Sequence, residues 1–231
     1  MAFSSREEIE AAQLEKLRSL ISKILPKNRF YRQKFGADFQ VDSLAEFSRD
    51  APFTFKTEIV EDQKKHPLYG SNLTYDLACY SRFNQTSGTT GSPLRWLDTN
   101  ESWSALLHCW NEVFTAADVS THATIFFAFS FGPFLGFWTA FESATRRGNL
   151  CIPGGGLSSE GRLRAIWDNQ ASVVCCTPTY AIRLGETAQK MDLPDSPVRT
   201  IIVAGEAGGS IPGVRGRIES LWPGAHVFDH H

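Results

Sequence analysis

Short apolar segments alternate with amphipathic ones throughout the second half of the chain, and this alternation is the feature that most constrains the fold. The predicted strands are residues 125–129, 150–152, 173–176, 200–204 and 226–228. The predicted helices between them are residues 133–146, 159–169, 180–191 and 211–221. Strands separated by helices of about 11 residues predict a parallel sheet with both faces covered. The sequence therefore predicts an α/β, doubly wound fold with a largely parallel sheet and helices on both faces.

The N-terminal region has a different, helical pattern. Leu14, Leu17, Ile21 and Ile24 alternate three and four residues apart, which predicts an amphipathic helix that ends near Pro26. Before it, residues 4–8 (Ser-Ser-Arg-Glu-Glu) are typical of a capping box rather than of a signal peptide. We predict a helical and irregular region over residues 1–78, packed on an α/β region over residues 79–231.

One stretch, residues 122–141, contains no Asp, Glu, Lys or Arg and approaches the length of about 20 residues that a membrane-spanning helix needs. Gly132 and Pro133 interrupt it, so a buried strand, a turn and a helix explain it better. A second helix is predicted after Asn100, because six apolar residues share one face there and form a core stripe: Trp103, Leu106, Leu107, Trp110, Val113 and Phe114.

Composition excludes some partners and compartments. The net charge is −2, from 23 basic and 25 acidic residues without a basic stripe, so we predict no nucleic-acid partner and no membrane. The five cysteines include no Cys-x-x-Cys pair. This pattern predicts buried, reduced thiols in a cytoplasmic protein.

The segment with the clearest chemistry is residues 86–93, Thr-Ser-Gly-Thr-Thr-Gly-Ser-Pro. Its glycines free the backbone to approach a ligand closely, and its hydroxyls and amide groups can converge on anionic oxygens. It is not a P-loop, because no Lys stands at the required offset. By composition alone a flexible linker would also be possible, and Gly154 to Gly156 could be a second phosphate loop, although a helix-entry turn explains that segment better.

Ligands of doubly wound sheets collect at the carboxyl ends of the strands. Three segments lie there in the predicted sheet: residues 129–134, Gly205 with Glu206, and residues 229–231. These segments are therefore the predicted surroundings of a bound ligand.

The order of residues in Thr86 to Pro93 resembles the phosphate-binding signature of the adenylate-forming superfamily, which includes acyl-CoA synthetases and luciferases. Other segments resemble the phenylacetate–CoA ligase branch, over a range that runs with gaps from about residue 20 to the last residue: residues 30–32, 52–54, 175–180 and 204–206. The resemblance identifies the chain as the N-terminal portion of such an enzyme and implies that residues 79–231 bind nucleotide and acyl group.

The resemblance also implies roles for individual residues. The ATP phosphates would be held by Ser87, Gly88, Thr89, Thr90 and Gly91, with Thr89 or Thr90 near magnesium. The adenine and acyl-adenylate would be lined by Ala204, Gly205, Glu206, Asp229, His230 and His231. The acyl pocket would be shaped by Phe129, Phe134 and Gly136.

The sequence departs from the family pattern at several positions. His231 stands where the family has an aromatic residue that stacks on adenine, and Leu94 stands where many members have Lys. The Mg-binding Glu and the catalytic Lys of the family are expected beyond residue 231, so we expect this chain alone to be inactive. His230 and His231 could also begin a purification tag, although the family motif explains Asp229 as well.

The implied function is ATP-dependent activation of a small, aromatic carboxylic acid to an acyl-adenylate and then to an acyl-CoA, with ATP, Mg and CoA as cofactors or co-substrates. Two alternatives stay open at this point. One is adenylation with a non-CoA acceptor, and the other is a non-catalytic nucleotide-binding or assembly subunit. An exposed edge at the last predicted strand also suggests a homodimer.

Overall fold

The computed structural model describes residues 5–86, 88, 92–191 and 193–230. These residues form two compact units, Met1–Asn100 and Glu101–His231, and each is described by itself. The predicted domain boundary near residue 78 falls inside the first unit, just before its hairpin. That boundary stays a prediction. Within the described ranges, no helix combines the length and the apolar character needed to cross a membrane.

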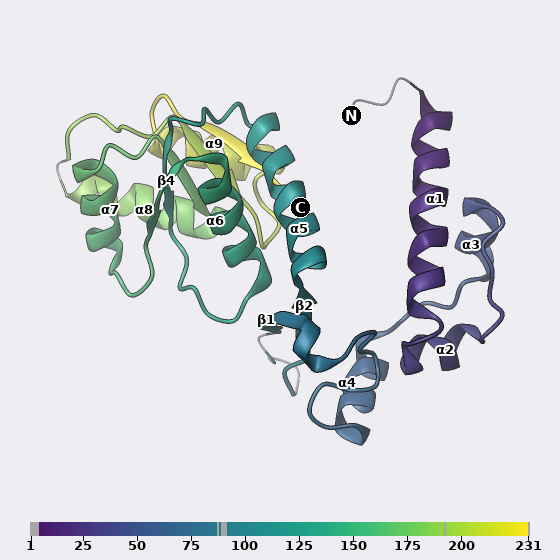
Figure 1. Ribbon diagram of the computed structural model, residues 1–231. Helices are drawn as coiled ribbons and strands as arrows, with labels where there is room; N and C mark the ends of the chain where they lie inside the picture. Colours follow the sequence, from purple (N-terminus) through teal and green to yellow (C-terminus); the bar gives the residue numbers. More distant parts are fainter. Residues whose placement is uncertain (1–4, 87, 89–91, 192, 231) are drawn as a thin grey trace. The chain divides into compact units, whose positions relative to one another are not determined.

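The first unit consists of helices followed along the chain by a two-stranded hairpin (Figure 1). Its elements are α1 (Arg6–Ile24), α2 (Arg29–Phe35), α3 (Leu44–Asp50), α4 (Lys56–Lys65), η1 (Leu77–Cys79), β1 (Tyr80–Gln85) and β2 (Arg95–Thr99). Ser5 caps α1 by accepting a hydrogen bond from the amide of Glu8, as the capping pattern predicts. Ile21 is buried, and Leu14, Leu17 and Ile24 pack around it, which confirms the predicted apolar stripe.

The second unit contains a five-stranded parallel sheet with the order β4-β3-β5-β6-β7. The strands are β3 (Thr124–Phe127), β4 (Leu150–Pro153), β5 (Val173–Cys176), β6 (Thr200–Val203) and β7 (His226–Asp229). The helices are α5 (Asn100–Ala116), α6 (Leu135–Arg147), α7 (Ser159–Asp168), α8 (Pro178–Lys190) and α9 (Pro212–Leu221). The predicted doubly wound α/β class is confirmed.

Both faces of this sheet are buried, because successive strand residues enter opposite cores. Phe126, Val174 and Ile201 point to a core that they share with α7, α8 and α9. Ile125, Phe127 and Ile202 point to the other core, which α5 and α6 close. Two layers of helices thus enclose the sheet, as the ribbon of the second unit shows (Figure 1).

The prediction for the cysteines is only partly right. Cys175 and Cys176 are free and buried in β5, where burial raises the pKa of the Cys176 thiol to about 12. Cys79 and Cys109 are free but exposed, so the prediction that they are buried is wrong. Cys109 lies on the outer face of α5, one residue before the buried Trp110, so the helical period turns it away from the core.

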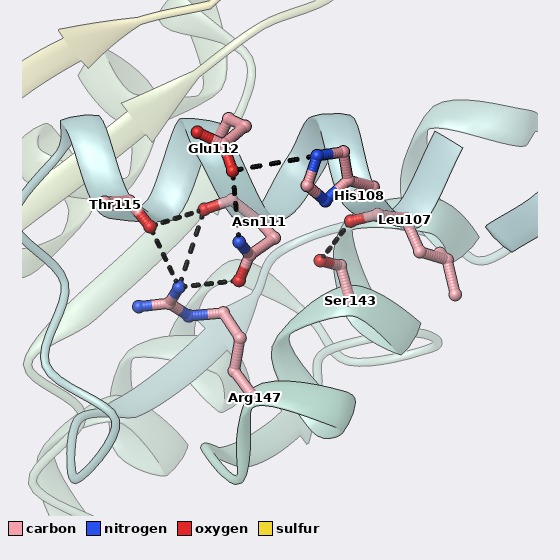
Figure 2. Close-up of polar contacts among 7 residues, drawn as sticks. All are labelled: Leu107, His108, Asn111, Glu112, Thr115, Ser143 and Arg147. Carbon is pink, nitrogen blue, oxygen red and sulfur yellow. Dashed lines mark hydrogen bonds and ion pairs between the residues drawn. The ribbon is translucent and has the colours of Figure 1, made fainter. Parts of the chain in front are cut away.

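One arginine joins α5 to α6 on the face of the sheet that these helices cover (Figure 2). Arg147, in the last turn of α6, donates to the Asn111 side-chain oxygen at 2.8 Å and to the Thr115 hydroxyl at 3.1 Å. Its other terminal nitrogen donates to the Val119 carbonyl at 2.9 Å. The guanidinium therefore bonds polar groups of the last turns of α5 and of the loop beyond it, where a cation also complements the helix dipole.

We expect Arg147→Met to lower the free energy of unfolding by about 2 kcal/mol, because several charge-assisted hydrogen bonds to partly buried acceptors are lost together. Chemical denaturation measures the difference. The matched control is Arg146→Met, one residue earlier, whose contact with the Ser104 hydroxyl is exposed and 3.4 Å long. That control should change stability by less than about 0.5 kcal/mol. Equal effects of the two substitutions would contradict the role of Arg147.

Candidate functional site

The carboxyl ends of four neighbouring strands lie level with one another. Backbone hydrogen bonds continue the ladder past the strand ends, from Ala128 N to Cys175 O at 3.0 Å and from Ala204 N to Cys176 O at 3.2 Å. His230 N likewise donates to Val203 O at 2.9 Å. The chain runs outward from β3 to β4 and then returns to the other side of β3 at β5. That reversal is a topological switch point, where α/β sheets open a crevice for ligands.

The turn after β6 is locked to the start of α8. Glu206 accepts hydrogen bonds from the Thr179 amide at 2.8 Å and from the Thr179 hydroxyl at 2.5 Å. The hydroxyl bond, followed by the amide bond, lowers the pKa of the Glu206 carboxyl below its usual value. Gly205 has a φ of +91°, in the left-handed region that favours glycine. The residues Ala204 to Glu206 therefore form a fixed, anionic turn at the edge of the sheet.

Asp229 lies beside the chain that leaves β6. It ends β7 rather than following it, and its carboxylate accepts a hydrogen bond from the Ser210 hydroxyl at 2.5 Å. A Cβ at Gly209 would lie 2.4 Å from Val203 Cγ2 and 2.6 Å from Asp229 Cγ. Only glycine permits this close approach, so position 209 sets how the β6–α9 segment passes the carboxylate.

His230 follows β7 and packs against α5. Its ring meets the Trp110 ring edge to face, with centroids 4.6 Å apart and an interplanar angle of 68°. Trp110 was predicted only as a core residue, and nothing in its spacing indicates a partner 120 positions away. His231, the other predicted adenine residue of this segment, lies outside the described residues.

Aromatic side chains gather where β3 ends. Phe129 is buried and stacks on Phe137, with centroids 4.2 Å apart and an interplanar angle of 16°. Phe134 meets Phe137 edge to face at 5.8 Å and stands at the N-cap of α6. Gly136 is the second residue of α6, and a Cβ there would meet nothing within 4 Å. The structure thus brings Phe129 and Phe134 onto one shared ring, beside an unobstructed glycine.

The predicted phosphate loop belongs to the first unit and joins β1 to β2. Ser87, Thr89, Thr90 and Gly91 lie outside the described residues, and Gly88 has a φ of +70°. The base of the loop is closed by two hydrogen bonds between Thr86 and Leu94, each 3.0 Å long.

An α4 side chain, which sequence reasoning missed, holds the strand that follows the loop. The Gln63 amide nitrogen donates to Arg95 O at 2.7 Å, and the Gln63 amide oxygen accepts from Arg95 N at 3.1 Å. A glutamine in a largely polar helix such as α4 carries no sequence signal of such a role.

Comparison with known proteins supports the superfamily resemblance. No family model matches the sequence. The chain is similar to the phenylacetate–coenzyme A ligases of Thermus thermophilus (27% identical over 188 residues, covering 80% of this chain and 41% of the relative) and Escherichia coli (26% over 193 residues, 81% and 42%). The chain therefore spans less than half the length of these relatives.

Solved structures agree. The chain resembles 2-hydroxyisobutyryl-CoA ligase in an open conformation with 2-HIB-AMP and CoA, with a TM-score of 0.90 and 26% identity over 98% of this chain and 50% of that one. The same enzyme in its thioesterification state gives a TM-score of 0.91 and 27% identity, over 98% and 49%.

The α/β fold of this chain, a five-stranded parallel sheet flanked by helices, matches the adenylate-forming enzyme fold. Within that class the similarity is to the phenylacetate–CoA ligases, which confirms the resemblance predicted from the sequence.

The lowered pKa of Glu206 predicts a pH dependence of stability. A carboxyl whose pKa is depressed by folding stabilises the protein above its unfolded pKa, and this contribution is lost as the pH falls through the folded pKa. We therefore expect the unfolding temperature of Glu206→Gln to fall less than that of the wild type between about pH 5 and pH 3. Circular dichroism over a pH series measures this. Asp195→Asn, which removes an exposed carboxyl, should keep the wild-type slope; parallel curves for wild type and Glu206→Gln would contradict the assignment.

Proposed function

We propose that the full-length protein that contains this chain is an AMP-forming carboxylate–CoA ligase. ATP and a carboxylic acid would give an acyl-adenylate and pyrophosphate, and the thiol of CoA would then take the acyl group and release AMP. The observation that carries the proposal is the level carboxyl edge of the sheet, where the Glu206 turn, His230 and the phenylalanine cluster lie at the ends of neighbouring strands. Because the chain spans under half of its curated relatives, turnover is proposed for the full-length protein.

Different residues are proposed to bind different parts of the substrates. In the first unit, the glycines and hydroxyls of Ser87 to Gly91 would bind the ATP phosphates, and Thr89 or Thr90 would lie near magnesium, for which hydroxyl and phosphate oxygens are suitable hard ligands. In the second unit, residues 204–206 and 229–231 would line the adenine and the acyl-adenylate. Phosphoryl and nucleotidyl transfer depends on such positioning and on charge stabilisation.

CoA is the favoured acceptor, because the structural neighbour was solved with both an acyl-AMP and CoA and the curated relatives are CoA ligases. A non-CoA acceptor and a non-catalytic subunit would appear as two different results. Pyrophosphate release without acyl-CoA formation supports the former, and no pyrophosphate release with any acid supports the latter. A homodimer and a cytoplasmic location stay predictions.

The acid is proposed to be aromatic or arylacetic. Flat ring faces at Phe129 and Phe134 suit a flat apolar substrate, and aromatic pairs of this geometry contribute beyond their buried area. The relatives name two kinds of acid, phenylacetate and 2-hydroxyisobutyrate, so the choice between them depends on this cluster.

We expect the full-length protein to use phenylacetate or benzoate with a kcat/KM at least about tenfold above that for acetate or 2-hydroxyisobutyrate, since each buried methylene-sized group contributes about 1 kcal/mol or more. Pyrophosphate release over a panel of acids measures the preference. The acids are compared at fixed, saturating ATP, so that differences report the acyl site. A higher kcat/KM for either small acid would contradict an aromatic pocket.

The phosphate loop gives a second prediction. We expect the double substitution Thr89→Val and Thr90→Val in the full-length protein to lower ATP–pyrophosphate exchange at least about tenfold, because hydroxyl donors and metal-facing oxygens near the phosphates are lost. Thr121→Val, which replaces an exposed threonine of the second unit, is the matched control and should leave exchange unchanged. Unchanged exchange in the double variant would remove the loop from the ATP site.

A further inference from the structure

We propose that Arg162 of α7 is a positioning residue that fixes the wall of the acyl pocket at the end of β3, and thereby sets the affinity for the carboxylic acid. This inference rests on the proposed function of that pocket. It assigns a role to a side chain from the opposite face of the sheet, which sequence reasoning did not single out.

Arg162 bonds to the carbonyls at the ends of two adjacent strands. Its Nε donates to Gly154 O, just past β4, at 2.9 Å. Its terminal nitrogens donate to Ala128 O at 3.0 Å and to Phe129 O at 3.5 Å, just past β3. One planar, permanently charged fork therefore holds both strand ends, which a lysine ammonium cannot do with the same geometry.

The guanidinium is itself held in place from α8. It lies over the Tyr180 ring, 4.9 Å from the centroid, and the Tyr180 hydroxyl lies 3.2 Å from the Ser159 hydroxyl of α7. Cation–π contact and the hydroxyl pair limit the rotamers that Arg162 can adopt. The fork is thus pre-organised, so little side-chain freedom is lost when it bonds to the carbonyls.

The segment that Arg162 holds has an unusual backbone. Phe131 has a φ of +51°, a region that bulky side chains rarely adopt. A Cβ on the next residue, Gly132, would lie 2.7 Å from the Phe134 ring, and the Trp138 indole N–H donates to Gly132 O at 3.1 Å. Such a backbone persists only when its surroundings fix it, and here Arg162 fixes one end and Trp138 the other.

We therefore expect the loss of Arg162 to disturb first the phenylalanine cluster at the end of β3, which is the wall of the proposed acyl pocket. Phe129 stacks on Phe137, and its carbonyl is one of the three that Arg162 bonds. When that carbonyl is released, the Phe129 ring can shift against its neighbour, and a displacement of this kind weakens binding of a flat substrate. The residues proposed to bind the ATP phosphates belong to the other unit, and Arg162 is proposed to act only on the acyl side, so we expect ATP binding to be spared.

The test compares Arg162→Met, Arg162→Lys and Arg164→Met in the full-length protein, by pyrophosphate release with phenylacetate and with ATP each varied in turn. Arg164 is an exposed residue of the same helix and is the matched control. For Arg162→Met we expect the KM for phenylacetate to rise about tenfold, while kcat and the KM for ATP stay within about threefold of wild type. The KM of Arg162→Lys for phenylacetate should lie between those of the wild type and Arg162→Met, and the KM of Arg164→Met should match that of the wild type.

Each result decides one point. An unchanged KM for phenylacetate in a folded Arg162→Met variant overturns the positioning role. A parallel rise in both KM values with a lower unfolding temperature overturns it too, because Arg162 would then support the fold in general. If Arg162→Met does not fold, the same criteria apply to Arg162→Lys. If the wild type releases no pyrophosphate with any acid, the proposed function itself fails, and this inference fails with it. In every other outcome the wild type is active, so failure of the inference can be told apart from failure of the proposed function.

Discussion

The parallel sheet of the second unit is buried on both faces, and the rest of that unit depends on this constraint. Side chains at successive strand positions, such as Ile125 and Phe126, enter two different cores. Because helices cover both faces of such a sheet, its polar side chains can reach a ligand only near the strand ends, where the backbone ladder stops and loops begin. The candidate site lies at the carboxyl ends, and the ladder that continues into Ala128, Ala204 and His230 keeps these strand ends level.

The groups at this edge are fixed by short, specific contacts rather than by general packing. Glu206 is bonded to Thr179 at the start of α8, His230 lies against Trp110 of α5, and Arg162 of α7 holds the carbonyls beyond β3. Each of the three contacts joins a strand end to a different helix. The helices that build the two cores thus also orient the edge, which is how a site gains the rigidity that binding and positioning require.

The alternating apolar segments were sufficient to predict the strands, the helices and the doubly wound class, because burial on both faces leaves a period that a single sequence displays. The order of the strands was not predictable, since the return from β4 to β5 across β3 leaves no local signal. The contacts of the site were hidden for a similar reason. An arginine within a helix, such as Arg162, has the pattern of a solvated residue, and Glu206 finds its partner 27 positions away. The exposed Cys79 and Cys109 were predicted wrongly for another reason: the general preference of cysteine for burial does not determine whether a given residue faces the core or the solvent.

Fold stability and the proposed acyl recognition would share side chains on one face of the sheet, and this limits how the proposed pocket can change. Phe129 is 8% exposed and belongs to the core that α5 and α6 close, so shortening it to alanine would cost about 3 to 5 kcal/mol, a large part of a typical domain's stability. Phe134 is half-buried at a helix N-cap, and Gly136 has open space where a side chain would begin. We therefore expect substitutions at these two positions to alter the proposed pocket with little loss of core packing. Differences in acid preference among proteins of this fold are therefore expected at Phe134 and Gly136, while Phe129 is held by the needs of the fold.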